Sequence, residues 1–486
     1  LQIAATGSIV SGLIINRWTD VGITVNFADD VSILGNWIGL ASSGVAVAPN
    51  NGNGIFGWQV ANLRIGTSER GDRNVISGNL GNGIYILDAG NSEEASYIHN
   101  NYIGLFPSGI EGAGNAGSGI RLTNVVNMEI GSFGNDAGNV IAGSGFAGIY
   151  LDQGSNLRVH QNVIGLSAFN TASSNGDGIL IDGATDVKIG ALFEEPSAGG
   201  GNVIVGNQNA GIRVINDATR VDIFGNRIGV DQSGEFSFGN GIGILLEGVG
   251  GVRIGQVGGL GNIIANSASD GIQIRKLEGG SQNPIRANSI YDNGRLGINL
   301  VAATDDATGF TPNDANDTDS GANDLFNYPI VSAFTGGANP SVSGIYQGLV
   351  NTEIFVDLFY SFSPHLGEGK FYLGTVNIAT DASGFAPFVL NLPNALPPGA
   401  FVTAVGTSNH PQFGNSSEFS PMFAAARVYV WDGGGGADTD WFNPLNWDLD
   451  DSFPQDGDTA SLTINATITL NNSDISVANF IQTAGT

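Results

Sequence analysis

The four residues Asn162-Val163-Ile164-Gly165 decide how this chain folds, because the pattern Asn-x-Ile-Gly returns throughout residues 1–300. Successive copies begin 65, 61, 64 and 62 residues apart, and the fifth, Asn288-Ser289-Ile290, lacks the glycine. A fixed period of this length predicts a repeat architecture. The other full copies are Asn36-Trp37-Ile38-Gly39, Asn101-Tyr102-Ile103-Gly104 and Asn226-Arg227-Ile228-Gly229.

A second asparagine pattern is interleaved with the first, and Gly-Ile pairs run through both. Ten Gly-Ile pairs recur every 26 to 36 residues. Most are followed by alternating aliphatic residues, as in Gly83-Ile84-Tyr85-Ile86, which indicates short strands with one apolar face. No segment shows a helical period. Short strands at a fixed repeat, with no helices between them, predict a parallel β-solenoid of about ten coils.

Stacked coils place equivalent residues on top of one another. This buries columns of Ile, Val and Leu, and it aligns asparagines whose amides both donate and accept along the stack. Insertions such as Leu40–Asn53 follow Asn-x-Ile-Gly, whereas in the alternate coil insertions such as Ile189–Gly201 follow a Val/Leu-x-Ile-Gly step. We therefore expect two sets of loops at different corners. The predicted ladder comprises Asn36, Asn74, Asn101, Asn139, Asn162, Asn202, Asn226, Asn262 and Asn288.

Composition and charge narrow the class of protein. Glycine makes up 75 of 486 residues without a Gly-X-Y period, and 41% of residues are hydrophobic, which argues against both collagen and disorder. The formal net charge is −28, with −10 from residues 1–300 and −18 from residues 301–486. An acidic field repels phosphate backbones, so we expect no nucleic-acid partner. Without cysteine there are no disulfides, and no apolar run is long enough for a membrane span.

An acidic segment ends the repeat. We predict that the β-helix domain covers residues 1–326 and closes with an acidic linker at residues 302–326. Calcium prefers hard oxygen ligands, and five oxygen-bearing side chains crowd around Gly321, so calcium is the expected cofactor. The alternative is a plain acidic hinge. The candidate ligands are Asp314, Asp317, Asp319, Asn323 and Asp324.

The sequence changes character twice more. Six or seven short candidate strands over residues 327–424 predict an immunoglobulin-like β-sandwich, although the Cys/Trp pin of antibody domains is absent. Residues 425–486 contain a glycine- and aspartate-rich stretch, two tryptophans and further alternating strands, and are predicted to begin a second β-solenoid. Within them, Gly433–Asp438 is similar to one copy of a calcium-binding nonapeptide repeat, with a simple turn as the alternative.

These repeated words resemble those of secreted bacterial surface proteins with right-handed parallel β-helix repeats of pectate-lyase-like fold. The likeness continues through Asn323–Pro329 into a small sandwich, and Trp431–Trp447 is similar to the start of autotransporter passenger repeats. The resemblance implies an all-β chain whose helix is right-handed. It also implies an extracellular, cell-surface protein with an adhesive or structural role, whereas the fold alone licenses no activity.

Carbohydrate-active enzymes share this fold, so a catalytic member would be expected to carry recognisable acid, base or metal-binding groups. The Gly-His-Gly and Arg-x-Lys motifs expected of a polygalacturonase-type hydrolase are absent. Asp152, Asp182 and Asp222 belong to different coils, and stacking alone would decide whether they converge. We therefore predict a non-catalytic rigid rod that binds copies of itself, assembling into filaments, or binds cell-surface polysaccharide. The alternative is a polysaccharide-binding or polysaccharide-cleaving protein of lyase or glycosidase type.

Overall fold

The structure is a computed structural model of the 486-residue chain. It describes residues 1–91, 93–132, 137–192, 200–234, 236–276, 280–335, 339–363, 367–397, 399–410, 413–425, 428–448, 453–454, 458–464, 466–470, 477 and 479–483. No helix among these residues is long and apolar enough to cross a membrane.

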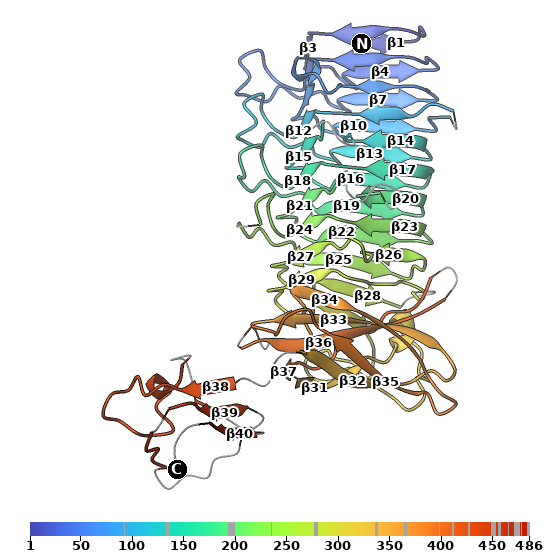
Figure 1. The fold of residues 1–486 in the computed structure, drawn as a ribbon. Coiled ribbons are helices and arrows are strands. Elements are labelled where there is room, and N and C mark those ends of the chain that lie inside the picture. Colours follow the sequence, from blue (N-terminus) through green and yellow to red (C-terminus); the bar gives the residue numbers. More distant parts are fainter. Residues whose placement is uncertain are drawn as a thin grey trace.

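The predicted all-β, right-handed parallel β-helix is confirmed, and Figure 1 shows its coils stacked along one axis. The first sheet has eleven strands: β1 (Gln2–Ile3), β4 (Ile23–Asn26), β7 (Ile55–Trp58), β10 (Ile84–Leu87), β13 (Ile120–Thr123), β16 (Ala147–Asp152), β19 (Asp177–Asp182), β22 (Ala210–Ile215), β25 (Ile242–Glu247), β28 (Ile272–Arg275) and β30 (Ile298–Val301).

Two further sheets complete each coil. The second contains β2 (Ile9–Ser11), β5 (Ser32–Leu34), β8 (Arg64–Ile65), β11 (Ser96–Ile98), β14 (Val126–Ile130), β17 (Ser155–Val159), β20 (Thr185–Gly190), β23 (Thr219–Phe224) and β26 (Val252–Ile254). The third contains β3 (Ile14–Ile15), β6 (Trp37–Ile38), β9 (Val75–Ile76), β12 (Tyr102–Ile103), β15 (Val140–Ile141), β18 (Val163–Ile164), β21 (Val203–Ile204), β24 (Arg227–Ile228), β27 (Ile263–Ala265) and β29 (Ser289–Tyr291). A short 3-10 turn, η1 (Arg70–Asp72), lies in one of the loops.

The strands stack in register, so each Gly-Ile pair lies directly above the next. The isoleucines of the first sheet form one buried file, because parallel pairing aligns equivalent residues of neighbouring coils. Each of them is at most 1% exposed. The file comprises Ile23, Ile55, Ile84, Ile120, Ile149, Ile179, Ile212, Ile244, Ile272 and Ile298.

All nine asparagines of the sequence ladder lie in one continuous file between the second and third sheets, from Asn36 to Asn288. Each side-chain amide donates to the Oδ1 atom of the next asparagine at 2.8 to 3.1 Å. The backbone N–H of each residue donates to the same oxygen, as Asn162 does to Asn202 at 2.9 Å. The amides of this file thereby satisfy one another, which is what a low-dielectric interior requires.

A second file lies at the corner after the third sheet, and the repeat words do not single it out. Its asparagines use the same geometry, with 2.9 Å between Asn50 Nδ2 and Asn79 Oδ1. Serines interrupt it at two positions. Their backbone N–H groups still donate to the next asparagine, but their hydroxyls have no hydrogen-bond partner among the described residues, so the side-chain ladder is broken there. The file comprises Asn50, Asn79, Asn115, Ser144, Asn175, Asn207, Asn240, Ser267 and Asn293.

Residues from 330 onward form a two-layered antiparallel sandwich. One layer contains β31 (Ile330–Thr335), β32 (Ser341–Gln347) and β35 (Phe385–Asn391); the other contains β34 (Phe371–Ala379), β33 (Glu353–Ser361), β36 (Phe401–Ser408) and β37 (Phe423–Ala424). The fourth strand therefore pairs with the third rather than with the fifth. The immunoglobulin-like assignment of this sandwich stays a prediction.

The segment expected to be an acidic linker is packed against the end of the β-helix. Its 3-10 turn η3 (Ala322–Leu325) buries Ala322 and Leu325 in the same apolar core as the isoleucine file. Asn323 is fully buried, and its Nδ2 donates to the carbonyl oxygens of Asn283 and Ser416 at 2.8 and 3.0 Å. The segment links the two regions as predicted, but its apolar residues and satisfied amides make it part of the core.

The sandwich also closes the β-helix with charged groups. Arg286 forms a buried bidentate ion pair with Asp357, with nitrogen–oxygen distances of 2.7 and 3.0 Å. Glu368 accepts from the backbone and side chain of Asn293 at 2.8 and 3.0 Å, so it caps the second asparagine file. Glu418 accepts from the backbone N–H of Leu300 at 2.8 Å.

The last region forms a parallel sheet of β38 (Val428–Trp431), β39 (Thr459–Leu462) and β40 (Asn479–Gln482), with the 3-10 turn η4 (Pro444–Asn446). Parallel strands are what the predicted start of a second solenoid requires. Its small core holds Trp441 and Trp447, whose ring centroids are 4.7 Å apart. Trp447 Nε1 donates to the Trp441 carbonyl oxygen at 2.9 Å.

Candidate active site

The outer face of the first sheet carries the most varied chemistry on the β-helix. Pairing in register aligns one outward residue from each coil into a column, just as it aligns the buried isoleucines. The column does not repeat: aromatic, basic and apolar residues alternate along it. It comprises Thr24, Phe56, Tyr85, Arg121, Tyr150, Leu180, Arg213, Leu245, Gln273 and Asn299.

Arg121 lies at the centre of this column between two tyrosines. Its guanidinium carbon is 5.2 Å from the ring centroid of Tyr85 and 4.9 Å from that of Tyr150. Its Nη2 donates to Oδ2 of Asp152 at 2.7 Å. Thr123 Oγ1 donates to the same oxygen at 3.1 Å. The arginine is thus held rigidly at the surface by two rings and one carboxylate.

Asp152 and Asp182 occupy the same position on the neighbouring strands β16 and β19. Parallel strands lie ~4.8 Å apart, so the two carboxyl groups emerge side by side from the sheet. The Tyr150 hydroxyl donates to Oδ2 of Asp182 at 2.9 Å, and Asn216 Nδ2 donates to its Oδ1 at 2.8 Å. Burial, followed by the negative charges of Asp182 and Asp152, raises the pKa of Tyr150 above its ordinary value, so this phenol keeps its proton.

The third carboxylate singled out in the sequence does not join this pair. Asp222 lies on β23 of the second sheet, where it forms a bidentate ion pair with Arg253 at 2.6 and 2.7 Å. Whether Asp152, Asp182 and Asp222 converge was left open by the sequence. Stacking brings the first two together and leaves the third on another sheet.

Aromatic rings continue the site toward the first coils. Phe27 and Trp58 pack edge to face with centroids 4.6 Å apart, and the centroids of Phe56 and Tyr85 are 5.4 Å apart. Phe27 is 62% exposed, which leaves a ring face open to a ligand. Exposed aromatic rings beside polar groups form the kind of platform on which the apolar faces of sugar rings stack.

A second charged group lies farther along the same face. Glu247 is held by Arg213 at 2.6 Å and by Arg275 at 3.3 Å. Asp177 is nearly buried, its Oδ1 accepts from the Ala210 backbone, and burial raises its pKa. Two arginines and two carboxylates neutralise one another here, so fewer of their oxygens are open to a substrate than at Asp152 and Asp182.

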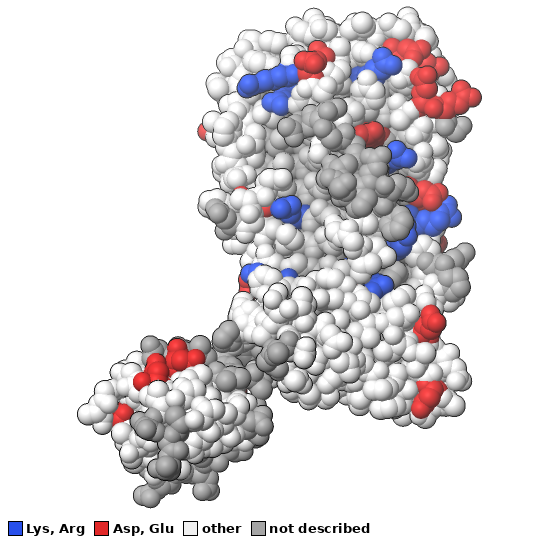
Figure 2. All heavy atoms as spheres, viewed as in Figure 1, with Lys and Arg blue, Asp and Glu red and all other residues white. Residues whose placement is uncertain are grey.

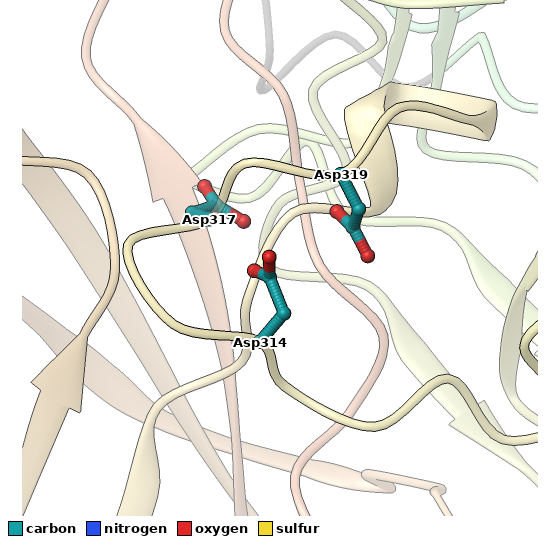
Figure 3. Close-up of side chains that lie close together, drawn as sticks. All are labelled: Asp314, Asp317 and Asp319. Carbon is teal, nitrogen blue, oxygen red and sulfur yellow. The ribbon is translucent and has the colours of Figure 1, made fainter.

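The calcium candidates separate into two sets. Oxygens of Asp314, Asp317 and Asp319 lie within 4.8 Å of one another, and Figure 3 shows these three carboxylates close together. Burial and the neighbouring carboxylates raise the pKa of Asp317 to about 7, and burial raises that of Asp319. Asp319 Oδ1 is buried without a hydrogen-bond partner among the described residues. This trio is the only such group of at least three within the part of the chain that the structure describes.

The other two candidates have structural partners instead. Asn323 is used by the buried amide contacts to Asn283 and Ser416. Asp324 accepts from the Ser281 hydroxyl at 2.7 Å and from the Asn415 amide at 2.8 Å. That these two residues join the aspartates at one ion stays a prediction, with their oxygens already bound to neighbouring side chains and backbone.

No protein-family model and no curated protein sequence matches this chain. Several solved structures are similar to this chain at low identity. The A-module of mannuronan C-5 epimerase from Azotobacter vinelandii shares 15% identity at a TM-score of 0.34, over 61% of this chain and 74% of its own. The enzymatically active domain of tailspike protein 2 from bacteriophage CBA120 shares 13% at 0.32, over 87% and 69%. A capsular polysaccharide depolymerase, the gp49 tailspike of Acinetobacter baumannii bacteriophage Fri1, shares 10% at 0.20, over 85% and 68%.

These names correct one expectation. The sequence predicts a non-catalytic chain, because it resembles structural or adhesive surface proteins and the motifs of known hydrolases are absent. The similar structures are named as an epimerase, an enzymatically active domain and a depolymerase, which contradicts that prediction. Absence of a linear motif is weak grounds in a solenoid, since catalytic residues come from separate coils and meet only after stacking.

Proposed function

We propose that this chain binds and cleaves a polysaccharide on the outer face of the first sheet. The supporting observation is the pair Asp152 and Asp182 on adjacent strands, flanked by Arg121 and Tyr150. Retaining glycosidases hold two carboxyl groups roughly 5–5.5 Å apart, and side chains on adjacent strands, whose backbones lie ~4.8 Å apart, can reach such a separation. The polysaccharide alternative drawn from the sequence thereby replaces the purely structural or adhesive reading.

The two carboxyl groups would take different parts in breaking the glycosidic bond. Asp182 would protonate the leaving oxygen, because Asp152 is the member of the pair that is ion-paired with Arg121. Asp152, paired with the fixed charge of Arg121, suits attack on the anomeric carbon or stabilisation of its positive charge. Water then completes hydrolysis, with Asp182 returning as the base. The rings of Trp58 and Tyr85 would hold sugars on the side of the first coils.

The test is release of new reducing ends from a panel of polysaccharides, with Asp182→Asn as the variant. Loss of a general acid lowers the rate by about 10²–10⁴-fold. Asp186→Asn is the matched control, because Asp186 is an exposed carboxylate on the second sheet, ion-paired with Arg220. Equal activity of both variants, or products that carry new double bonds, would overturn the proposed carboxylate mechanism.

A polymer of this kind lies outside cells, so we also propose a secreted protein that meets its substrate at a surface. The chain has no cysteine, so cysteine usage does not indicate the compartment. The proposal of a secreted protein rests on the substrate class. Filament assembly from copies of the chain stays a prediction.

We further propose that the Asp314, Asp317 and Asp319 trio binds calcium beside the joint between β-helix and sandwich. A divalent cation would stabilise three carboxylates whose negative charges lie close together, and the Oδ1 atom of Asp319, which has no partner among the described residues, offers a ligand atom. The proposal covers these three residues and leaves out Asn323 and Asp324.

A further inference from the structure

A cleft of about 590 Å³ lies on the outer face of the third sheet, away from the Asp152 and Asp182 pair. Its floor is the outward column of five successive strands, β12 to β24, so it runs along the axis for about 19 Å at the spacing of parallel strands. Gln232, in the hairpin loop after β24, contributes to one wall. The loops that precede the strands contribute Arg73, Gly200 and Gly259. These are the two sets of loops that the insertions in the sequence predict.

The charge of this cleft is opposite to that of the chain. Its described lining contains two basic residues, Arg73 and Arg227, and no carboxylate. Figure 2 shows that the basic side chains visible in that view lie on the β-helix, above the sandwich and the last region. The two arginines mark the ends of the floor, with Val140, Val163 and Val203 between them. Arg73 stacks on Tyr102 at 4.1 Å and is thereby held in place.

Two polar atoms in the cleft are left without partners. Arg227 Nε and Gln161 Oε1 are buried, and neither has a hydrogen-bond partner among the described residues. One is a charged donor and the other an acceptor, and a buried polar group without a partner destabilises the empty cleft. A ligand that offers both hydroxyl donors and anionic acceptors would satisfy the two together.

We infer that this cleft is a second carbohydrate site, which binds an extended acidic oligosaccharide without cleaving it. The valine floor and Tyr102 receive the apolar ring faces, Gln161 receives a sugar hydroxyl, and Arg227 binds a ring carboxylate. A site open along the axis suits a chain rather than a single sugar. The inference goes beyond the proposed function, because the cleft lies on a different sheet and its described lining holds no carboxylate to act as acid or base.

The test measures binding by calorimetry to an oligogalacturonate and to a cello-oligosaccharide of the same length. Asp182→Asn serves as the parent protein, so that turnover at the first sheet does not interfere. We expect Arg227→Gln to weaken oligogalacturonate binding about tenfold or more, as loss of a charge-assisted hydrogen bond predicts, and to change cello-oligosaccharide binding little. Gln161→Asn, which shortens the side chain at a position with positive φ that suits asparagine, is expected to weaken both ligands a few-fold.

Arg158→Gln is the matched control, since Arg158 is an exposed arginine on β17 of the second sheet. It should leave both affinities unchanged, and all variants should keep the melting temperature of the parent. The inference is overturned if Arg227→Gln binds the acidic chain as well as the parent, if the neutral chain binds equally well, or if neither chain binds. None of these outcomes bears on activity at Asp152 and Asp182, so failure here is distinct from failure of the proposed function.

Discussion

The inward and outward columns of the first sheet share the same strands but differ in what they repeat. Inward, isoleucine follows isoleucine from Ile23 to Ile298, and none is more than 1% exposed. Outward, the same coils carry Tyr85, Arg121 and Tyr150 in succession. Packing selects one residue type at every coil, because each coil must fit the next. Chemistry needs different groups at neighbouring positions, so we propose that the function lies where the repeat fails.

The largest effect is expected at the joint, where the ordered interior continues into the sandwich. Arg286→Met leaves Asp357 buried without its cation, and removal of one partner of a buried ion pair costs about 3–5 kcal/mol. Arg220→Met is the matched control: Arg220 and Asp186 form an equally bidentate pair on the surface, where solvent screens the charges and the pair adds little to stability. Chemical denaturation measures both. Equal losses would mean that the joint is not part of the interior.

The next largest loss of stability is expected in the buried asparagine file. Asn162→Ala removes the acceptor of Asn139 and the donor to Asn202, and should cost about 2–4 kcal/mol through unsatisfied buried groups. Asn409→Ala, at an exposed amide bonded to Glu353, should cost less than about 0.5 kcal/mol. Similar melting temperatures for the two variants would show that the file contributes little beyond shape.

A pH effect is expected at the joint between the β-helix and the sandwich. Burial raises the pKa of Glu418 to about 8. Because the folded pKa lies above the unfolded value of 4.5, the folded state binds more protons in between, so stability falls as pH rises from about 4.5 to about 8. Glu418→Gln cannot titrate and should flatten this part of the curve of melting temperature against pH. An unchanged slope would assign the pH dependence to other groups.

Calcium should produce the smallest change. If the Asp314, Asp317 and Asp319 trio binds the ion, adding a chelator lowers the melting temperature by a few degrees, as saturating ligand contributes a few kcal/mol at most. Asp319→Asn should abolish that shift, whereas Asp306→Asn, at an exposed turn outside the trio, should retain it. A melting temperature independent of chelator removes the calcium site from the account.

The contrast between repeated and non-repeated positions also explains which features of the fold could be predicted from the sequence. The stacked coils and the nine-residue asparagine file follow from residues that recur at one spacing, as Asn162 and Asn226 do. The second file was missed because Ser144 and Ser267 interrupt it, and only their backbone N–H groups preserve the hydrogen bonds. The pairing of Asp152 with Asp182 was open in the sequence, since it depends on both register and face. The buried role of Asn323 was hidden in an acidic stretch that looks like a loop.

The central claim is that inward columns build the rod while the outward column of the first sheet performs the reaction. One paired measurement tests it: the melting temperature and the rate of reducing-end release for Asn162→Ala and Asp182→Asn. We predict that Asn162→Ala melts at a lower temperature but retains its rate per folded molecule, and that Asp182→Asn melts like the parent but loses its rate by about 10²–10⁴-fold. If Asp182→Asn keeps its activity, or if Asn162→Ala loses activity while keeping its stability, the division between the two columns is wrong.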